Sequence, residues 1–253
     1  MIQSFIIAFS MYSKIPMPTI EWNKENMKYA LGFFPLVGAA IGAVLSLWCY
    51  IADKLNIGSM LFAAVATVIP VLITGGIHLD GFCDTVDAKS SHQSMERKLE
   101  ILKDPHIGAF ALIYSMVYFV VNFGLWTEFN ISVKNVLLIY LGFVLSRAFS
   151  GLAIVTFKCA KNSGLAYMFA SGAEKKKVRN IMAVYIIAAA VAALIINPII
   201  GALVIIAILL TFIYYKQMSY KQFGGITGDL AGYFLQIAEL ALLAVIVLAG
   251  GVR

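Results

Sequence analysis

The chain has 253 residues, of which 61% are hydrophobic and only 13% are charged. Soluble domains carry about 25% charged residues, so this composition excludes an ordinary soluble globule and indicates an integral membrane protein. Three cysteines far apart in the chain exclude a secreted disulfide scaffold, and we attribute the net charge of +6 to basic loops beside a membrane rather than to a surface that binds nucleic acid.

The first 18 residues precede the candidate membrane spans. No Lys or Arg precedes Lys14 and no small-residue cleavage site follows, so the segment lacks the pattern of a signal peptide. Pro16 and Pro18 end it, because proline interrupts a helix. We expect residues 1–18 to lie in the membrane interface as a short amphipathic or re-entrant helix.

Seven later stretches are apolar and long enough to cross about 30 Å of hydrocarbon. They cover residues 29–51, 59–77, 107–126, 133–157, 181–196, 198–215 and 229–250. Asn197 and Pro198 predict a tight turn between the fifth and sixth, since one helix across both would be too long to span once. The predicted fold is an all-α polytopic bundle of about seven transmembrane helices, with residues 1–253 forming a single membrane-embedded domain.

The basic residues predict how this bundle is oriented, because Lys and Arg are retained in short cytoplasmic loops. With seven spans, 15 of the 19 fall on the side of the N-terminus, and Lys54, Lys134 and Arg253 fall on the other side. Arg147 lies within the fourth span. We therefore expect a protein of the cytoplasmic (inner) membrane with a cytoplasmic N-terminus.

Three carboxylates follow the second span. On a helix Asp80, Asp84 and Asp87 share one face, where they repel one another by roughly 1 kcal/mol per close pair in water and by more in drier surroundings. A hard divalent cation such as Mg²⁺ would neutralise them and leave positions for substrate phosphate. The alternative is a solvated acidic helix face. This alternative is weakened because the whole chain has only 13 acidic residues and three of them fall in this segment. The pattern favours a metal site.

A basic segment precedes the third span. Arg97 and Lys103 are candidate phosphate ligands, the first as a fork of donors and the second as a point charge. The same residues also fit a charged amphipathic helix on the anionic inner leaflet.

Arg147 lies about ten residues inside the fourth span, where a charge costs roughly 2.5 kcal/mol or more on insertion. Such residues usually face a polar cavity, although snorkelling or a structural pair with a buried carboxylate would also explain it. Glu239, at mid-membrane in the last span, is a candidate partner.

Two further cytoplasmic segments carry polar residues. Lys161 lies in a basic loop after the fourth span, where the positive charge serves phosphate binding or only topology. Phe223–Gly232 leads into the last span, and amides at a helix N-terminus suit an anionic ligand. Asp229 in this segment is either a functional carboxylate or an N-cap.

Together these residues place carboxylates for a metal, cations for phosphate and a Gly-rich helix entrance on one side of the membrane. They are the parts of phosphoryl-transfer chemistry, in which catalysis is largely positioning and charge neutralisation. The sequence holds neither a zinc-protease motif nor a zinc-site spacing among His78, His92 and His106.

The run Gly75-Gly76-Ile77-His78-Leu79-Asp80-Gly81-Phe82-Cys83-Asp84-Thr85-Val86-Asp87-Ala88 resembles the signature of the cobalamin synthase (adenosylcobinamide-GDP ribazoletransferase) family. The resemblance extends to Ile15–Pro18, Phe34–Gly38, Arg97–Phe110, Ser146-Arg147 and Gly224–Asp229. It implies a Mg²⁺-dependent membrane transferase that joins adenosylcobinamide-GDP to α-ribazole or its 5′-phosphate. GMP is released and adenosylcobalamin or its 5′-phosphate is formed. The expected partners are these substrates and the lipid bilayer, with a homo-oligomer left open.

The resemblance also implies roles for individual residues. Asp80, Asp84 and Asp87 would hold Mg²⁺ against the diphosphate. A set of basic residues would neutralise phosphate oxygens, namely Arg97, Lys103, Arg147 and Lys161. Asp229 would hold a second metal or act as the catalytic base toward the ribose hydroxyl, with His78 as a weaker candidate for that base.

Three other functions remain open from the sequence. A CDP-alcohol phosphotransferase also uses an Asp-rich membrane motif, but that motif continues Asp-Gly with Ala-Arg, whereas Phe82-Cys83 follows Asp80-Gly81 here. An aspartate-rich membrane prenyltransferase expects two Asp clusters, whereas Asp229 stands alone. A cation transporter predicts broken helices near mid-membrane rather than acids gathered at one face.

Overall fold

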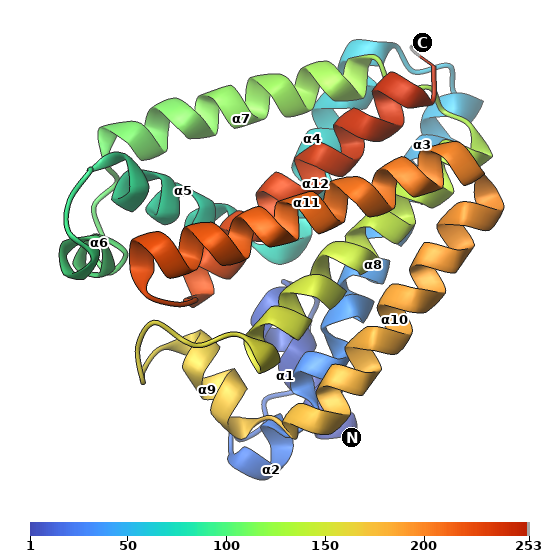
Figure 1. The fold of residues 1–253 in the computed structure, drawn as a ribbon. Helices are drawn as coiled ribbons and strands as arrows, with labels where there is room; N and C mark the ends of the chain where they lie inside the picture. The colour runs from blue at the N-terminus through green and yellow to red at the C-terminus, as the bar shows by residue number, and fades with distance from the viewer. Residues whose placement is uncertain (252–253) are drawn as a thin grey trace.

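A computed structural model describes residues 1–251, and the chain folds into a bundle of helices (Figure 1). The elements in chain order are α1 (Ile2–Tyr12), α2 (Lys24–Met27), the 3-10 helix η1 (Ala30–Phe33), α3 (Phe34–Lys54), α4 (Ser59–Thr74), α5 (Ile77–Ser90), α6 (Met95–Ile101), α7 (Ala109–Thr127), α8 (Val133–Thr156), α9 (Leu165–Gly172), α10 (Lys175–Ile196), α11 (Pro198–Phe223) and α12 (Gly228–Ala249). Within residues 1–251 the extended pairing is limited to a bridge between Cys159 and Ile226. The predicted all-α fold is confirmed.

The number of membrane-spanning helices agrees with the prediction. Six helical segments are long and apolar enough to cross a membrane, and the count is seven if the bent pair α4 and α5 forms one span. The outward faces of α7, α10 and α11 are apolar, as the exposure of Val120, Val184 and Leu210 illustrates. Such faces suit lipid, because a hydrocarbon solvent accepts apolar side chains while the helix satisfies its own backbone.

The long helices run back and forth between two ends of the bundle (Figure 1). One end carries the connections 13–23, 91–108, 157–164 and 224–227, and we refer to it as the basic end because most Lys and Arg side chains lie there. Lys54 and Lys134 lie at the opposite end, at the C-terminus of α3 and the N-terminus of α8. Arg253, which we also expect on that side, lies outside the described residues. Which end faces the cytoplasm stays a prediction.

The predicted second span is shorter than expected and is sharply bent. The α4 helix ends at Thr74, and α5 leaves it at an angle of 95°. Gly75 and Gly76 both have positive φ, at 65° and 81°, which glycine adopts without the steric cost that a side chain would add. The bend turns α5 so that its carboxylates lie along the basic end rather than deeper in the bundle.

The turn at Asn197 is confirmed. Its side chain accepts hydrogen bonds from the backbone N–H groups of Ile199 and Ile200, both at 3.1 Å, and so caps α11. Pro198 is the first residue of α11, where its missing N–H leaves no helical hydrogen bond unmade. Two spans therefore replace one overlong helix, as the sequence predicts.

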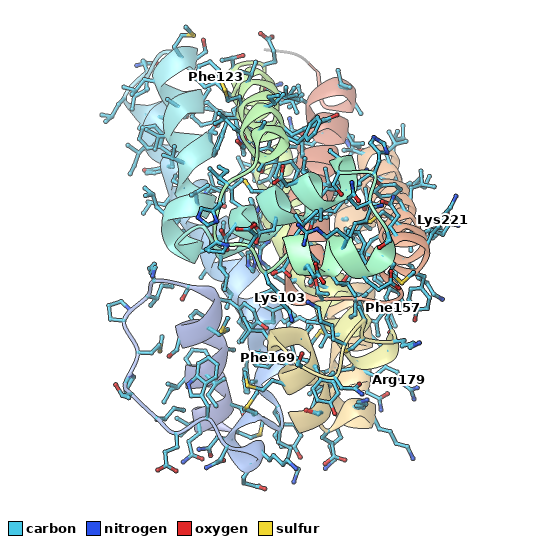
Figure 2. The ribbon with its side chains drawn as sticks, turned by 90° about the vertical axis from the view of Figure 1, so that its left-hand side faces the viewer. Lys103, Phe123, Phe157, Phe169, Arg179 and Lys221 are labelled. Atoms are coloured by element: carbon cyan, nitrogen blue, oxygen red, sulfur yellow. The ribbon has the colours of Figure 1, made fainter. Side chains whose placement is uncertain are left out.

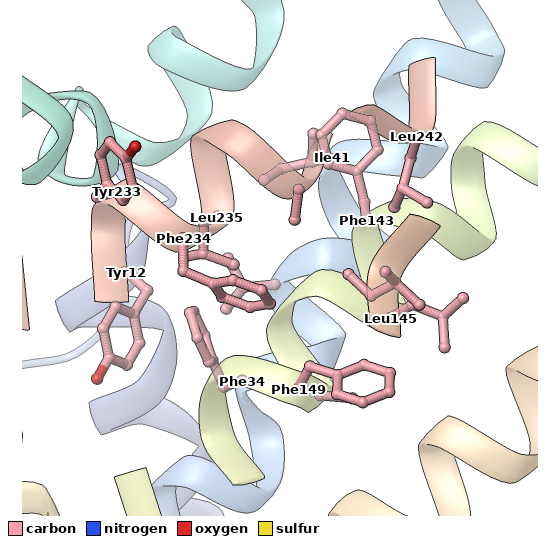
Figure 3. Packing of buried hydrophobic residues seen from close by; sticks show 14 of the residues in the cluster. Tyr12, Phe34, Ile41, Phe143, Leu145, Phe149, Tyr233, Phe234, Leu235 and Leu242 are labelled. Carbon is pink, nitrogen blue, oxygen red and sulfur yellow. The ribbon is translucent and has the colours of Figure 1, made fainter. Parts of the chain in front are cut away.

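The N-terminal segment is more deeply buried than the sequence suggests. The α1 helix packs against α2, η1 and α3, and Ile7 and Ala8 are fully buried. The helix ends at Tyr12, before the prolines, and the backbone N–H of Lys14 donates to the carbonyl of Ile73 at the end of α4. Buried side chains from α1, α3, α8 and α12 meet in the core beneath the basic end, as Figure 3 shows for Tyr12, Phe34 and Phe234.

Candidate active site

Two glycines let α5 and α12 cross in close contact. A Cβ atom on Gly81 would lie 2.8 Å from the carbonyl oxygen of Asp229, and one on Gly232 would lie 2.9 Å from the carbonyl oxygen of His78. Real Cβ atoms do not approach backbone this closely, so the crossing requires glycine at both positions. Because Asp80 precedes Gly81 and Asp229 lies in the first turn of α12, the crossing brings these carboxylates to one place.

A cavity of about 360 Å³ opens beside this crossing at the basic end. Its walls come from α1, α5, α8, the start of α9, the start of α12 and the connections around residues 103, 161 and 226. Five of the predicted site residues line it, namely His78, Asp80, Lys103, Lys161 and Asp229. The structure therefore gathers residues that are up to 151 positions apart in the sequence.

The acidic wall of the cavity is organised by Thr227. Its hydroxyl accepts a hydrogen bond from the backbone N–H of Leu230 at 3.2 Å and so caps α12. The same hydroxyl donates to the Oδ2 atom of Asp229 at 3.2 Å, which orients the carboxylate. Thr227, and not Asp229, is the N-cap residue, so the N-cap alternative for Asp229 is wrong.

The basic wall consists of Lys103 and Lys161. The ammonium group of Lys161 donates to the carbonyl of Leu99 at 3.2 Å, which ties the 157–164 loop to α6. Burial lowers the pKa of Lys161 below its ordinary value, and the charge of Lys103 lowers it further, while Asp229 acts in the opposite direction. Two ammonium groups that disfavour each other's charge form a good site for an anion, since an anion between them relieves the repulsion.

The loop that carries Lys161 is fixed against the entrance of α12. The backbone N–H of Ile226 donates to the carbonyl of Lys158, and the backbone N–H of Ala160 donates to the carbonyl of Ile226, both at 2.9 Å. These bonds hold the basic loop against the Gly224–Gly228 segment. Figure 2 shows Lys103 above Phe169 of α9, with Phe157, the residue after α8, to one side.

The inner wall of the cavity is aromatic. Tyr12 stacks on the His78 ring with centroids 6.0 Å apart and contacts Phe34 at 4.2 Å. Ser150 on α8 completes this wall. The Nε2 atom of His78 and the hydroxyl of Ser150 are buried and have no hydrogen-bond partner among residues 1–251. Buried polar atoms of this kind cost free energy unless a ligand or water pairs with them.

Asp84 and Asp87 share the predicted helix face with Asp80 but do not line the cavity. Asp84 is half-buried and lies near the other carboxylates. Asp87 accepts a hydrogen bond from the backbone N–H of Ala111 at 3.3 Å, in the first turn of α7. A carboxylate is favourable there, because the first N–H groups of a helix lack partners and carry partial positive charge.

Arg97 and Arg147 also lie away from the cavity. Arg97 is exposed on α6 and forms an ion pair with Glu100 at 2.6 Å. Arg147 is fully buried in α8, one helical turn below Ser150, and forms an ion pair with Glu239 to which Ser146 also donates a hydrogen bond. The candidate pairing of Arg147 with Glu239 is thus confirmed as a contact. Phosphate binding by Arg147 stays a prediction, and it would require this pair to open.

The acidic residues fit a divalent cation by their chemistry. Within residues 1–251 the carboxylates of Asp80, Asp84 and Asp229 form no ion pair with a basic side chain. No group of three His, Cys, Asp or Glu side chains in that range converges as a ready-made metal site. Mg²⁺ is usually bound through one or two carboxylates together with substrate phosphates and water. The unpaired carboxylates and the two ammonium groups across the cavity fit a Mg²⁺ ion that is shared with a substrate phosphate. Among the described residues, they do not form a site in which protein side chains alone surround the ion.

Tyr12, Ser150 and Thr227 are among the cavity residues that the sequence reasoning missed. Tyr12 was hidden by the apolar composition of α1, which does not distinguish packing on protein from contact with lipid. Ser150 carried no signal of its own. Thr227 had one, because Thr before Gly-Asp at the start of an apolar run is a pattern of helix capping.

Comparison with protein families matches residues 4–247 to the cobalamin-5-phosphate synthase family. An adenosylcobinamide-GDP ribazoletransferase of Lachnoclostridium phytofermentans is 50% identical over 251 residues, which cover 99% of this chain and 95% of that relative. Enzymes of the same name from Clostridium perfringens and Treponema denticola are 36% and 31% identical, over 92% and 96% of both chains in each case. No solved structure matches this chain. The relatives are transferases, which favours an enzyme over a transporter, and the chain belongs to the cobalamin-5-phosphate synthase family.

Proposed function

We propose that this protein joins adenosylcobinamide-GDP to α-ribazole or α-ribazole 5′-phosphate and releases GMP. The observation that carries the proposal is the cavity of about 360 Å³ in which Asp80 and Asp229 face Lys103 and Lys161. The names of its relatives supply the substrates. The residues around the cavity supply what a phosphoryl transfer requires, which is charge neutralisation and positioning of the reacting groups.

In the proposed reaction a hydroxyl oxygen of the ribazole ribose attacks the phosphorus that is attached to cobinamide. A new P–O bond forms to the ribazole, the bond from this phosphorus to the bridging oxygen breaks, and GMP leaves with that oxygen. The Asp229 carboxylate takes the proton of the attacking hydroxyl, and the hydrogen bond from Thr227 keeps that carboxylate oriented. Lys103 and Lys161 pair with non-bridging phosphate oxygens from the opposite wall.

The proposal includes Mg²⁺. Asp80, with Asp84 one turn further along α5, would hold the ion against the diphosphate, where a divalent cation neutralises charge and improves GMP as the leaving group. Asp80 is exposed to the cavity, so it is the nearer ligand. Asp87 contributes indirectly in this scheme, since its hydrogen bond with α7 fixes the end of the helix that carries all three carboxylates.

The size and lining of the cavity suggest which part of each substrate enters. Pockets for small molecules have volumes of about 300–1,000 Å³, so this one is near the lower limit. The aromatic wall of Tyr12, Phe34 and His78 offers a surface for the flat base of the ribazole. The much larger corrin ring is then expected to stay at the mouth, with the diphosphate reaching inward.

We propose that the cavity faces the cytoplasm and that the protein resides in the inner membrane. The supporting observation is that the cavity lies at the basic end of the bundle, and positively charged loops are retained on the cytoplasmic side. Placing a free cysteine at the opposite end, for example by Ser59→Cys, and labelling it in intact cells with an impermeant reagent tests this orientation. Labelling is expected, and protection of that site together with labelling of the basic end would contradict the proposal.

The reaction itself is tested by GMP release from the purified protein in liposomes, supplied with adenosylcobinamide-GDP and α-ribazole 5′-phosphate. Release with Mg²⁺ and its loss with EDTA are expected, with the cobalamin product forming in equal amount. Release that is unaffected by EDTA would remove Mg²⁺ from the proposal. A folded protein that releases no GMP would contradict the substrate assignment, and CDP-alcohol and prenyl diphosphate substrates would then be tested.

A further inference from the structure

A second groove lies on the side of the bundle that faces the membrane. It runs between α7 and α12 over the outer face of α5, and the cavity described above is on the other face of that helix. Its walls are largely apolar, with Phe82 and Val86 from α5, Val117 and Val121 from α7, and Ile237 and Leu240 from α12. Val117 and Val121 remain exposed, so the groove opens laterally rather than toward the cavity.

One cationic side chain lies at the end of this groove nearest the basic end. The ammonium group of Lys89 donates a hydrogen bond to the hydroxyl of Tyr214 at 2.7 Å, and it lies 5.4 Å and 5.8 Å from the ring centroids of Tyr214 and Tyr233. Within residues 1–251 no carboxylate lies within ion-pairing distance of it. An ammonium group has three donors, so two remain available for an anionic acceptor.

The aromatic residues around Lys89 place it at the level of lipid headgroups. The phenolic hydroxyls of Tyr214 and Tyr233 approach each other at 3.3 Å, and Tyr114 from α7 borders the same groove. Tyrosines gather at the boundary between hydrocarbon and water, with the ring in the apolar layer and the hydroxyl in the polar one. The apolar walls then extend inward from this level, and Val121 lies seven positions beyond Tyr114, a rise of about 10 Å along α7.

We infer that this groove binds an anionic phospholipid of the surrounding bilayer. The phosphate of the headgroup pairs with Lys89 and with the tyrosine hydroxyls, and one acyl chain lies along Val117, Val121 and Ile237. The groove favours an anionic over a zwitterionic headgroup. Within residues 1–251 no carboxylate pairs with Lys89, so none is placed there to bind the positive charge of a choline group. The bound lipid contacts α5 through Phe82 and Val86, on the face opposite Asp80 and Asp84, and so supports the helix that carries the carboxylates.

The inference is tested by native mass spectrometry of the full-length protein, taken from nanodiscs that contain equal amounts of phosphatidylglycerol and phosphatidylcholine. The wild-type protein is expected to retain phosphatidylglycerol in preference to phosphatidylcholine. Lys89→Met is expected to weaken phosphatidylglycerol binding about fivefold or more, since it removes the cation that holds the headgroup. Lys89→Arg keeps the charge and is expected to keep most of the preference.

Lys221→Met provides a matched control, because Lys221 is an exposed lysine at the same end of the bundle but outside the groove (Figure 2). Its lipid binding is expected to equal that of the wild type. Val121→Trp fills the apolar part of the groove without a change in charge, and it is expected to weaken phosphatidylglycerol binding even if Lys89→Met does not fold. Unchanged binding in a folded Lys89→Met or Val121→Trp variant would overturn the inference, and so would an equal loss in Lys221→Met.

Discussion

The α5–α12 crossing provides a prediction whose size follows from the geometry. Gly81→Ala adds one methyl group that would lie 2.8 Å from the carbonyl oxygen of Asp229 and 2.9 Å from its Cα atom. Both neighbours are backbone atoms, so no side chain can rotate away to make room. Favourable contacts between non-bonded heavy atoms require about 3.5–4.0 Å, and the two helices must therefore separate locally by about 0.5–1 Å.

The expected loss of activity is larger than the expected loss of stability. Overpacking of this kind costs about 1–3 kcal/mol, and the better helix propensity of alanine offsets about 1 kcal/mol of it. The separation moves Asp229 relative to Asp80, and a misplacement of about 1 Å at a reacting centre costs about 10²-fold in rate. We therefore expect a folded protein whose kcat for GMP release is about 10²-fold lower.

Gly142→Ala is the matched control for this experiment. It also adds a methyl group at a contact of α12, but that group would lie 3.4 Å from the Cδ1 atom of Leu242, which can adjust. GMP release in liposomes and thermal unfolding in detergent are measured for both variants, with near wild-type rates expected for Gly142→Ala. Equal rates in the two variants would refute the role of the close crossing.

Three further predictions follow from other contacts. Glu239→Gln leaves Arg147 buried without its charged partner, which costs about 3–5 kcal/mol. This variant should therefore unfold in detergent at a lower temperature than a double variant in which Arg147 and Glu239 are both replaced by methionine. Equal unfolding temperatures would contradict the pairing. Lys161→Met should lower GMP release about 10²-fold because it removes a phosphate contact, whereas Arg97→Met, at an exposed pair, should stay within about twofold; a comparable loss in both would argue against the cavity as the phosphate site. Thr227→Val should lower both stability, by about 1 kcal/mol for the lost cap, and the rate of GMP release, while Thr227→Ser restores both; a rate unchanged in Thr227→Val would contradict the orienting hydrogen bond.

The number and approximate bounds of the spans could be predicted closely because each span carries its own local signals. The turn before α11 has two of them, since Asn197 caps the helix and Pro198 can only begin it. The bend between α4 and α5 was missed although Gly75 and Gly76 are visible in the sequence. Hydropathy averages over a window, and it does not register that both glycines adopt positive φ and redirect the chain by 95°.

The sequence predicted some of the residues that line the cavity, such as Asp80 and Asp229, but not how they are arranged. The cost of an unpaired charge in hydrocarbon was enough to suggest that Arg147 has an acidic partner. Only the structure shows that this partner is Glu239 and that neither residue lines the cavity. Asp80 and Asp229 lie together because Gly81 and Gly232 allow the backbones of α5 and α12 to touch. The spacing of residues along the sequence does not reveal such a contact between two helices. Tyr12 illustrates the same limit, since an apolar helix at the interface and one packed on protein have the same composition.

The most direct test of the central claim is the rate of GMP release after the facing carboxylates are neutralised one at a time. Asp80→Asn and Asp229→Asn keep side-chain size and alter only charge and proton affinity, and Asp53→Asn at the opposite end of the bundle is the control. We predict that each cavity variant inserts and unfolds like the wild type but releases GMP at least about 10²-fold more slowly, with Asp53→Asn unaffected. A rate within a few fold of the wild type in either cavity variant would contradict the assignment of this cavity as the active site.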